Sequence, residues 1–506
     1  MQRIIILLTA ASLLFGCSKD YLSKLPKDTL SPETFYANGD NLKIALIGIY
    51  DALQSENNFG KLPDLEGITD NGVHFKYETE LISFAQGITN ANSTQRFATY
   101  YQSAYQLIQR ANLVLDNIHA PGNVITAADR IAIKAEARAL RALAYMRLVY
   151  LYGDVPFYTT NIDLATSKEL SRTNRDTVIN FILGEFQSAA DSLSIKPYNN
   201  EKGRLTKQAV LALKARCMLY EARMQHQSWA SAWTAIQQAL TTADAAGNGL
   251  NSTFESTFTI ANIDNKEMLF ACKGNDLDKM ANIYTFFAAG GGNLSLSVHT
   301  NLVNDFYCTD GLPVNSSPLY NAASPYNNRD PRLKASISTP GDTYSTGTQL
   351  LAFNGHTTIG VLQTNFAMKK FTTINGLAQN QGQLDFPVIR YADLLLMAAE
   401  AENEVNGPTA NAYAAINKVR ARAGMPVVTT GLSANLFRQE VIHERRIEFA
   451  FEGLRWFDLV TLGIADSVIN NIGELNRKFV SHQQELFPIP QSERDLNPNL
   501  TQNPGY

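Results

Sequence analysis

Cysteine, histidine and tryptophan are scarce in this chain, and their scarcity excludes several kinds of site. The 506 residues include 4 cysteines, 7 histidines and 3 tryptophans. No two cysteines are spaced Cys-x-x-Cys and no histidines are paired at ligand spacing, so neither a disulfide framework nor a zinc site is indicated. No aspartate-rich loop is convincing as a calcium site either. We therefore predict no metal and no cofactor.

The chain also lacks an excess of charge of either sign. Its formal net charge is −4, from 43 basic and 47 acidic residues, which leaves no basic footprint for phosphate groups. Nucleic acid is therefore not expected as a partner. Hydrophobic residues make up 45% of the chain, a share that is typical of folded proteins and not of disordered ones.

The motifs of common enzyme classes are missing as well. The sequence has no phosphate-binding loop and no Gly-x-Ser-x-Gly turn. His443 and Glu444 begin like a zinc-protease helix motif, but Ile447 stands where the second histidine ligand is required. We therefore predict a protein that binds its ligand without catalysis.

Two groups of glutamates leave a further alternative open. They lie on two predicted helices: Glu400, Glu402 and Glu404 on the first, and Glu440, Glu444 and Glu448 on the second. A glycoside hydrolase needs two carboxyl groups that face each other across a sugar, which neighbours on one helix face do not provide alone. We favour a structural ion network, with its arginines drawn from Arg420, Arg422, Arg445, Arg446 and Arg455.

The first 16 residues are typical of a secretion signal. Arg3 supplies positive charge, an apolar run follows, and the small Gly16 immediately precedes Cys17. A small residue followed by cysteine at this place predicts cleavage before Cys17 and lipidation of that residue; the alternative is an ordinary signal peptide in which Cys17 has no role. The run is shorter than the roughly 20 apolar residues of a membrane-spanning helix. Acyl chains on Cys17 would anchor the protein to a membrane surface.

Apolar residues recur at helical spacing along most of the remaining chain, which predicts a mostly α fold. Alanine is abundant in several of these helices, and short loops join them in pairs, as in a tetratricopeptide-like scaffold of helix pairs with long irregular insertions and little β structure. The expected helices lie at about 31–53, 94–118, 127–152, 176–193, 206–220, 229–246, 390–405, 409–424 and 433–452.

Two regions lack helical periodicity and supply the candidate ligand contacts. Residues 57–92 are predicted to be an exposed loop, and residues 250–385 an ordered irregular segment in which glycines and prolines interrupt any helix. Sugar rings stack on flat aromatic faces, so we select eight aromatic residues from these regions as candidates. They are Phe75, Tyr77, Phe84, Tyr284, Tyr307, Tyr320, Tyr326 and Tyr344. The tryptophans, Trp229, Trp233 and Trp456, lie on or next to helices and are expected to pack.

A series of motifs resembles the SusD/RagB family of surface lipoproteins along almost the whole mature chain. The series begins with Cys17, Asp20-Tyr21-Leu22 and Pro26, and continues with a helix and turn that end in Tyr152-Gly153-Asp154-Val155-Pro156. The further motifs lie at 136–142, 310–313, 329–333, 387–397, 444–449, 455–459 and 487–490. Their order along the chain makes the resemblance specific.

This resemblance implies a SusD-like helical superhelix at the outer membrane, exposed on the cell surface as the lid of a SusC-like TonB-dependent transporter. It divides the chain into a signal peptide at 1–16, an N-terminal SusD-like region with its tether at 17–250, and a C-terminal RagB/SusD region at 251–506, whose insertion at about 251–385 binds the ligand. The expected function is capture of oligosaccharides for the transporter. Capture of peptides on the same scaffold is the first alternative, and a lipid-anchored glycoside hydrolase is the second.

Overall fold

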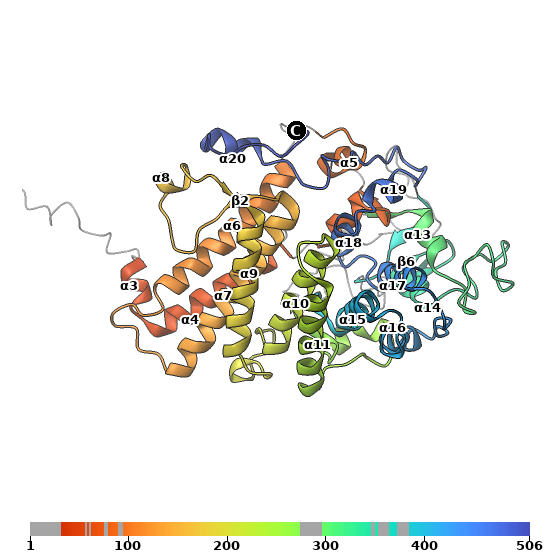
Figure 1. The fold of residues 1–506 in the computed structure, drawn as a ribbon, viewed down its shortest axis with the longest axis horizontal. Coiled ribbons are helices and arrows are strands. Elements are labelled where there is room, and N and C mark those ends of the chain that lie inside the picture. Colours follow the sequence, from red (N-terminus) through yellow and green to blue (C-terminus); the bar gives the residue numbers. More distant parts are fainter. Residues whose placement is uncertain are drawn as a thin grey trace, which may run out of the picture.

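The computed structural model describes residues 32–55, 58–59, 62–74, 79–89, 95–273, 296–345, 350–352, 364–371 and 384–506. Cys17 and the expected signal segment lie outside these residues. Within them the chain is mainly helical, as predicted, and most of the long helices follow one another across the molecule in chain order (Figure 1).

The N-terminal half contains the first series of helices. They are α3 (Pro32–Tyr36), α4 (Gly39–Gln54), α5 (Thr79–Ala85), α6 (Gln95–Asp116), α7 (Ala127–Tyr152), α8 (Leu164–Ser167), α9 (Arg175–Ser192), α10 (Lys207–Arg223) and α11 (Trp229–Ala245). Helix α7 shows why the predicted bounds agree so well with the observed ones. Thr126 caps its first turn by accepting a hydrogen bond from the backbone N–H of Asp129, and Gly153 ends it with a φ of 72°.

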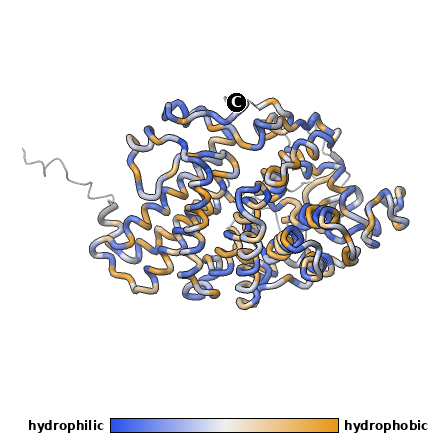
Figure 2. The backbone as a smooth tube through the Cα atoms, viewed as in Figure 1, coloured by the Kyte–Doolittle hydropathy of each residue, from blue (hydrophilic) through white to orange (hydrophobic). Residues whose placement is uncertain are grey.

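The C-terminal half holds the second series. Its helices are α13 (Thr300–Asp305), α14 (Pro331–Ser336), α15 (Tyr391–Asn406), α16 (Ala410–Arg422), α17 (Ala434–Glu448), α18 (Arg455–Thr461), α19 (Ala465–Ile469) and α20 (Gln491–Leu496). Each long helix packs on the next, from α6 through α7, α9, α10, α11 and α15 to α16, so the predicted scaffold of paired helices is confirmed. Apolar and polar positions alternate along these helices (Figure 2), as amphipathic packing requires.

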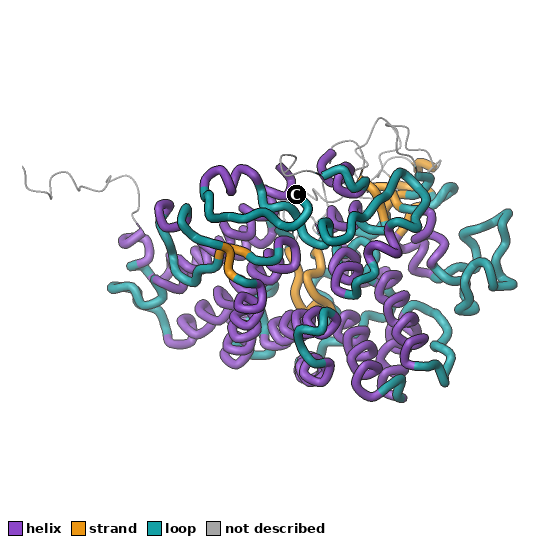
Figure 3. The backbone as a smooth tube through the Cα atoms, turned by 45° about the horizontal axis from the view of Figure 1, so that its top comes forward, coloured by secondary structure: helices purple, strands orange, loops and turns teal. Residues whose placement is uncertain are grey.

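Strands are few and short beside the helices (Figure 3). One sheet has the order β1 (Gly72–His74), β5 (Leu296–Val298), β9 (Ala367–Met368) and β6 (Ile337–Ser338). A second pairs β4 (Met268–Cys272) with β10 (Phe386–Arg390) in antiparallel register, Phe386 opposite Cys272. The two remaining pairs are β2 (Val155–Pro156) with β3 (Arg172–Thr173), and β7 (Thr343–Ser345) with β8 (Leu350–Ala352). The β4–β10 pair brings the two ends of the irregular middle segment together.

The prediction of an exposed loop at 57–92 is wrong for most of the described residues in that range. They form a 3-10 helix η1 (Leu62–Ile68), strand β1 and helix α5, and every residue from 63 to 74 is buried. Polar residues tolerate this burial because distant side chains pair with them. Asp70 binds Arg455 at 2.8 Å, and Asn71 accepts a hydrogen bond from Arg446 at 2.9 Å.

Most of the core lies between the helices, and a smaller cluster joins β5, β6, α13 and α17. The tryptophans pack as predicted: Trp456 is fully buried, and Trp229 and Trp233 lie half-buried against the main core. Among the described helices, none combines the length and apolar character that crossing a bilayer demands.

Candidate ligand-binding sites

Glu444 and Glu448 of the second group lie in a buried arginine–carboxylate network, with Glu448 at its centre, and Glu400 of the first group binds the buried Arg223. Glu448 accepts hydrogen bonds from Arg390 at 2.6 Å and Arg332 at 2.9 Å, and it also pairs with Arg422. Glu444 binds Arg332 at 2.5 Å and Arg420 at 3.2 Å. The predicted partners Arg420 and Arg422 are thus confirmed. Sequence reasoning missed Arg332 and Arg390, which come from other elements.

These carboxylates do not serve as acids or nucleophiles for an external substrate. Burial by itself would raise the pKa of Glu448, but Arg422, Arg390 and Arg332 hold that pKa well below its usual range. Glu444 and Glu448 are fully buried, and Glu400 is 1% exposed with both oxygens bound to Arg223 at 2.6 and 2.7 Å. A sugar cannot reach carboxyl groups in these positions, so Glu400, Glu444 and Glu448 are excluded as catalytic residues of a glycoside hydrolase.

Three predicted tyrosines lie on one irregular segment, residues 306–330, and all three are half-buried. The Tyr307 ring stacks on His443 with centroids 4.0 Å apart. The Tyr320 ring lies 6.0 Å from the guanidinium carbon of Arg329, and Tyr326 packs edge-on against Phe366. Each ring therefore has one neighbour that fixes it and part of its surface in solvent.

The prediction of Phe84 as a ligand contact is wrong, because this residue belongs to the core and not to a surface site. Its side chain is 1% exposed, and its ring packs against Phe97, Phe487 and Trp456 with centroid separations of 5.3, 5.3 and 5.7 Å. No ring face is left for a sugar. The remaining candidates lie outside the described residues: Phe75, Tyr77 and Tyr284 entirely, and Tyr344 in its side chain.

A further group of two carboxylates and one histidine resembles a metal site, but an arginine lies among them. Asp176, Glu221 and His226 offer ligand atoms within 4.8 Å of one another. Arg175 contacts all three: its Nη1 lies 2.5 Å from His226 Nδ1 and 2.9 Å from Asp176, and its Nη2 donates to Glu221 at 2.6 Å. The guanidinium supplies the positive charge that a metal would bring.

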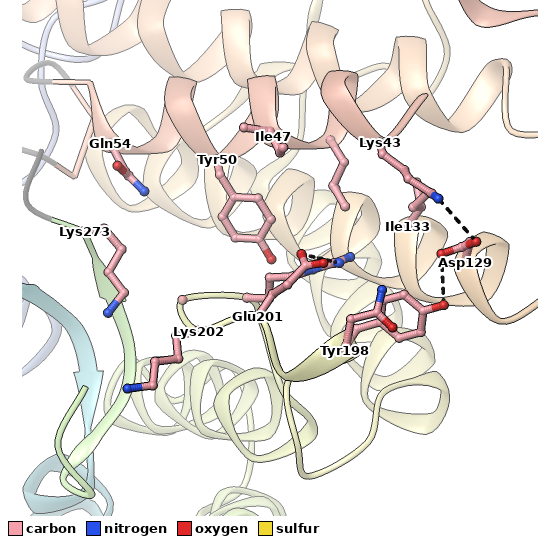
Figure 4. Close-up of a pocket in the computed structure, with 14 residues that line it drawn as sticks. Lys43, Ile47, Tyr50, Gln54, Asp129, Ile133, Tyr198, Glu201, Lys202 and Lys273 are labelled. Atoms are coloured by element: carbon pink, nitrogen blue, oxygen red, sulfur yellow. Dashed lines mark hydrogen bonds and ion pairs between the residues drawn. The ribbon is translucent and has the colours of Figure 1, made fainter. Parts of the chain in front are cut away.

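A pocket of about 320 Å³ opens between α4, α7 and the turn at 198–204, and we call it the charged pocket (Figure 4). Tyr50 and Lys43 reach into it from α4, and Asp129 reaches into it from α7. The turn is shaped by Asn199 and Asn200, which take left-handed φ values of 54° and 57° that asparagine tolerates better than most residues. The sequence pattern Tyr-Asn-Asn between two predicted helices was the available signal, and sequence reasoning missed it.

The charged groups of this pocket have ion-pair partners, some at short and some at long distance. Asp129 accepts a hydrogen bond from Tyr198 at 3.0 Å, and although burial opposes it, this bond and one from Thr126 lower the pKa of Asp129. Glu201 binds Arg204 at 3.0 Å. Lys43 lies 3.6 Å from Asp129, in the distance range of an ion pair but beyond a hydrogen bond. The lysine can therefore exchange its partner for a polar ligand.

Two family models match the chain, one after the other. A model described as starch-binding and associating with the outer membrane matches residues 20–219, and a SusD family model matches residues 266–506. A SusD-like protein of Formosa agariphila is 26% identical, with 100% of this chain and 99% of the relative covered.

Solved structures have the same fold. A SusD-like protein from Bacteroides fragilis superposes with a TM-score of 0.81 at 21% identity, covering 96% of this chain and 100% of that one. A SusD-like carbohydrate binding protein from the same species gives 0.80 at 24% identity, covering 92% and 100%. The activities named in these descriptions are binding activities, in agreement with the prediction of a non-catalytic protein.

Proposed function

We propose, from the premise that the chain belongs to the SusD/RagB family, that it binds oligosaccharides at the outer-membrane surface and passes them to a SusC-like TonB-dependent transporter. The succession of a starch-binding model and a SusD family model along residues 20–219 and 266–506 carries this proposal. The buried arginine–carboxylate network supports the view that the captured glycan is not hydrolysed, because its carboxylates cannot touch a substrate.

The described part of the irregular segment offers the chemistry for reversible capture. Tyr307, Tyr320 and Tyr326 present partly exposed rings that are already held in place by His443, Arg329 and Phe366. A ring that is fixed before binding loses little conformational entropy when a sugar stacks on it. We propose that these tyrosines contact the glycan, which the protein, acting as a tethered lid, then delivers to the barrel.

Isothermal titration against a panel of neutral and acidic polysaccharides tests the binding claim. We expect at least one polysaccharide to bind with no release of reducing ends over the same period. Hydrolysis of any of them contradicts the non-enzymatic mechanism. Co-purification of the tagged protein with a barrel transporter, followed by mass spectrometry, tests the partner.

Membrane attachment through Cys17 is a separate part of the proposal. Mass spectrometry of the mature N-terminus should find an acylated cysteine, and Cys17→Ala should move the protein out of the membrane fraction while its thermal melting temperature stays unchanged. An unmodified mature N-terminus beyond Cys17 contradicts the proposed anchor.

Capture of peptides remains a second candidate, and the placement of the tryptophans favours it. All three lie in helices and pack against the core, so the loops of this chain lack the largest ring for stacking on a sugar. Binding to a peptide library, with no polysaccharide bound, would select this function over the first.

A further inference from the structure

We propose that this protein has a second glycan-binding site, which we call the Tyr–Gln groove, and that it takes a short, uncharged stretch of oligosaccharide. The groove lies between α6, the loop around α8 and the C-terminal segment that contains α20. Its defining residues are Tyr101, Tyr105, Tyr158, Gln102, Gln106 and Gln109. This inference rests on the proposed function and adds a second point of contact with the same polymer.

The shape of the groove suits a small ligand. Its volume of about 310 Å³ falls at the lower end of the range of roughly 300–1,000 Å³ found for small-molecule sites. A stable protein partner would instead need a surface of about 800 Å² on each side. The groove is therefore sized for a few sugar units.

The aromatic wall of the groove is built from tyrosines that hold one another. The rings of Tyr105 and Tyr158 are nearly parallel, at 12°, with centroids 6.0 Å apart, and Tyr101 lies 4.8 Å from Tyr105. The Tyr105 hydroxyl donates to the carbonyl of Pro156 at 2.7 Å, which fixes the ring. Such a wall offers apolar surface to the C–H faces of a sugar.

Three glutamines supply most of the polar groups of the groove, and the two charged residues that line it, Lys168 and Glu493, are of opposite sign, so the lining carries no net charge. Gln102, Gln106 and Gln109 are exposed and share one face of α6. No hydrogen bond links the exposed side chains of Gln106 and Gln109 to another described residue, and the hydroxyl of Tyr101, whose side chain is 3% exposed, has only the Tyr105 hydroxyl as a neighbour to bond. A buried hydroxyl with at most one partner can accept a further hydrogen bond, which a sugar hydroxyl would supply. The charged pocket differs from the groove in this respect, because its carboxylates already have partners.

The walls of the groove are held rigid by hydrogen bonds that cross between its elements. Gln102 donates to Glu493 at 2.7 Å, which joins α6 to α20. The Asn497 side-chain amide donates to the carbonyl groups of Ser167 at 3.2 Å and Leu170 at 2.8 Å. A site that keeps its shape without ligand binds with a smaller entropic cost.

Two exposed leucines on the rim are consistent with this ligand but also allow a test. Leu164 is 71% exposed and Leu496 is 56% exposed, and both line the groove. They extend the apolar surface beside the tyrosines. If the groove served only to dock the transporter, these leucines would matter for co-purification and not for glycan binding.

The position of the groove predicts a gain in affinity for long polymers. Figure 1 draws α8 and α20 in the left half of the view, whereas α14, which directly follows the tyrosines at 306–330, lies at the right. A chain long enough to occupy both places binds the second one at a high effective concentration. We expect the polymer to bind at least about tenfold more tightly than its short oligosaccharides.

The test compares wild type with groove variants on two neutral glucans, laminarin and soluble starch, and on their short oligosaccharides. Gln106→Ala with Gln109→Ala, and separately Tyr101→Phe, should lower polymer affinity at least about tenfold and leave the melting temperature unchanged. Tyr101→Phe removes a hydroxyl whose only neighbouring group to bond is the Tyr105 hydroxyl, so it should change the stability of the fold little. Gln237→Ala is the control, because Gln237 is an exposed glutamine on α11 outside the groove.

Hydrogen exchange gives a second readout that separates the outcomes. Short oligosaccharide should protect the backbone at 164–170 and 491–500. Suppose that wild type and variants bind polysaccharides equally well and that these segments gain no protection. The proposal of a second site is then wrong, and the proposed function stands. If the variants lose only transporter co-purification, the groove is a docking surface. If wild type binds no polysaccharide, both proposals fail.

Discussion

The buried arginine–carboxylate network and the charged pocket use the same kinds of side chain for opposite purposes. In the network, Arg390 and Glu448 are at most 1% exposed, and each pairs with several partners at hydrogen-bonding distance. In the pocket, Lys43 is 47% exposed and Lys202 is 76% exposed, and their ion pairs are 3.6 and 3.7 Å long. A buried charge must be fully paired, whereas an exposed one keeps its freedom to change partners. Burial, more than residue type, separates scaffold from site here.

Glu448→Gln should produce the largest loss of stability, because it leaves three buried arginines short of a negative charge. Breaking a buried ion pair costs about 3–5 kcal/mol, which should appear as a large fall in the free energy of unfolding in urea. Glu404→Gln is the matched control: its partner Arg438 is 37% exposed, so the loss should stay below about 1 kcal/mol. Equal losses in both variants would contradict the difference drawn between buried and exposed charges.

Phe84→Ala extends the comparison to aromatic residues. Removal of a fully buried phenylalanine should cost about 3–5 kcal/mol, because Phe97, Phe487 and Trp456 lose their packing partner. Tyr320→Ala, in a half-buried ring, should cost less than about 1 kcal/mol and weaken glycan binding instead. Urea unfolding and titration on the same two variants give both numbers. If the Tyr320 variant loses as much stability as the Phe84 variant, Tyr320 is a structural residue and not a ligand contact.

The pH dependence of stability should reveal the buried carboxylates of the scaffold. Burial opposes ionisation of Asp393, but Arg216 and Arg445 lower its pKa to about 2. A folded-state pKa below the unfolded value of about 3.9 gives stability that is present above pH 4 and lost as the pH falls towards 2. The contribution at neutral pH is about 2–3 kcal/mol.

Comparison with Asp393→Asn isolates this contribution from that of the other carboxylates. The gap in unfolding free energy between wild type and this variant should be widest near pH 6 and should narrow between pH 4 and pH 3. Asp40→Asn serves as the control, since the Asp40 side chain is 85% exposed and its gap should be small throughout. A gap for Asp393 that is independent of pH would show that this carboxyl group has the same pKa in the folded and unfolded states.

The helices were predictable because their signals are local. The capping threonine, the apolar stripe and the terminal glycine of α7 all lie within or beside the helix, and its predicted bounds, 127–152, are the observed ones. The same holds for α15, α16 and α17 to within a few residues. An ion network between helix faces was also predictable, since glutamates and arginines recur at helical spacing.

The misplaced features depend on contacts between distant parts of the chain. The segment around Asn71 has the polar composition of a loop, but Arg446, 375 positions away, binds Asn71 and lets it be buried. Phe84 was placed with this supposed loop and therefore with the surface. The charged pocket and the Tyr–Gln groove are each assembled from elements far apart in sequence, so no local sequence pattern predicts them.

The smallest loss of stability is expected for the exposed lysines of the charged pocket, Lys43 and Lys202. Lys43→Ala and Lys202→Ala each remove one exposed ammonium group that makes only long ion pairs, so each should change the unfolding free energy by less than about 1 kcal/mol. If the charged pocket holds part of the glycan, either change should still weaken binding of a polysaccharide that wild type binds, by several-fold in titration. Lys207→Ala, in a lysine outside the pocket, provides the control. Unchanged binding in both pocket variants would assign the loosely paired lysines to the solvated surface and leave the tyrosines at 306–330 and the Tyr–Gln groove as the candidate contacts.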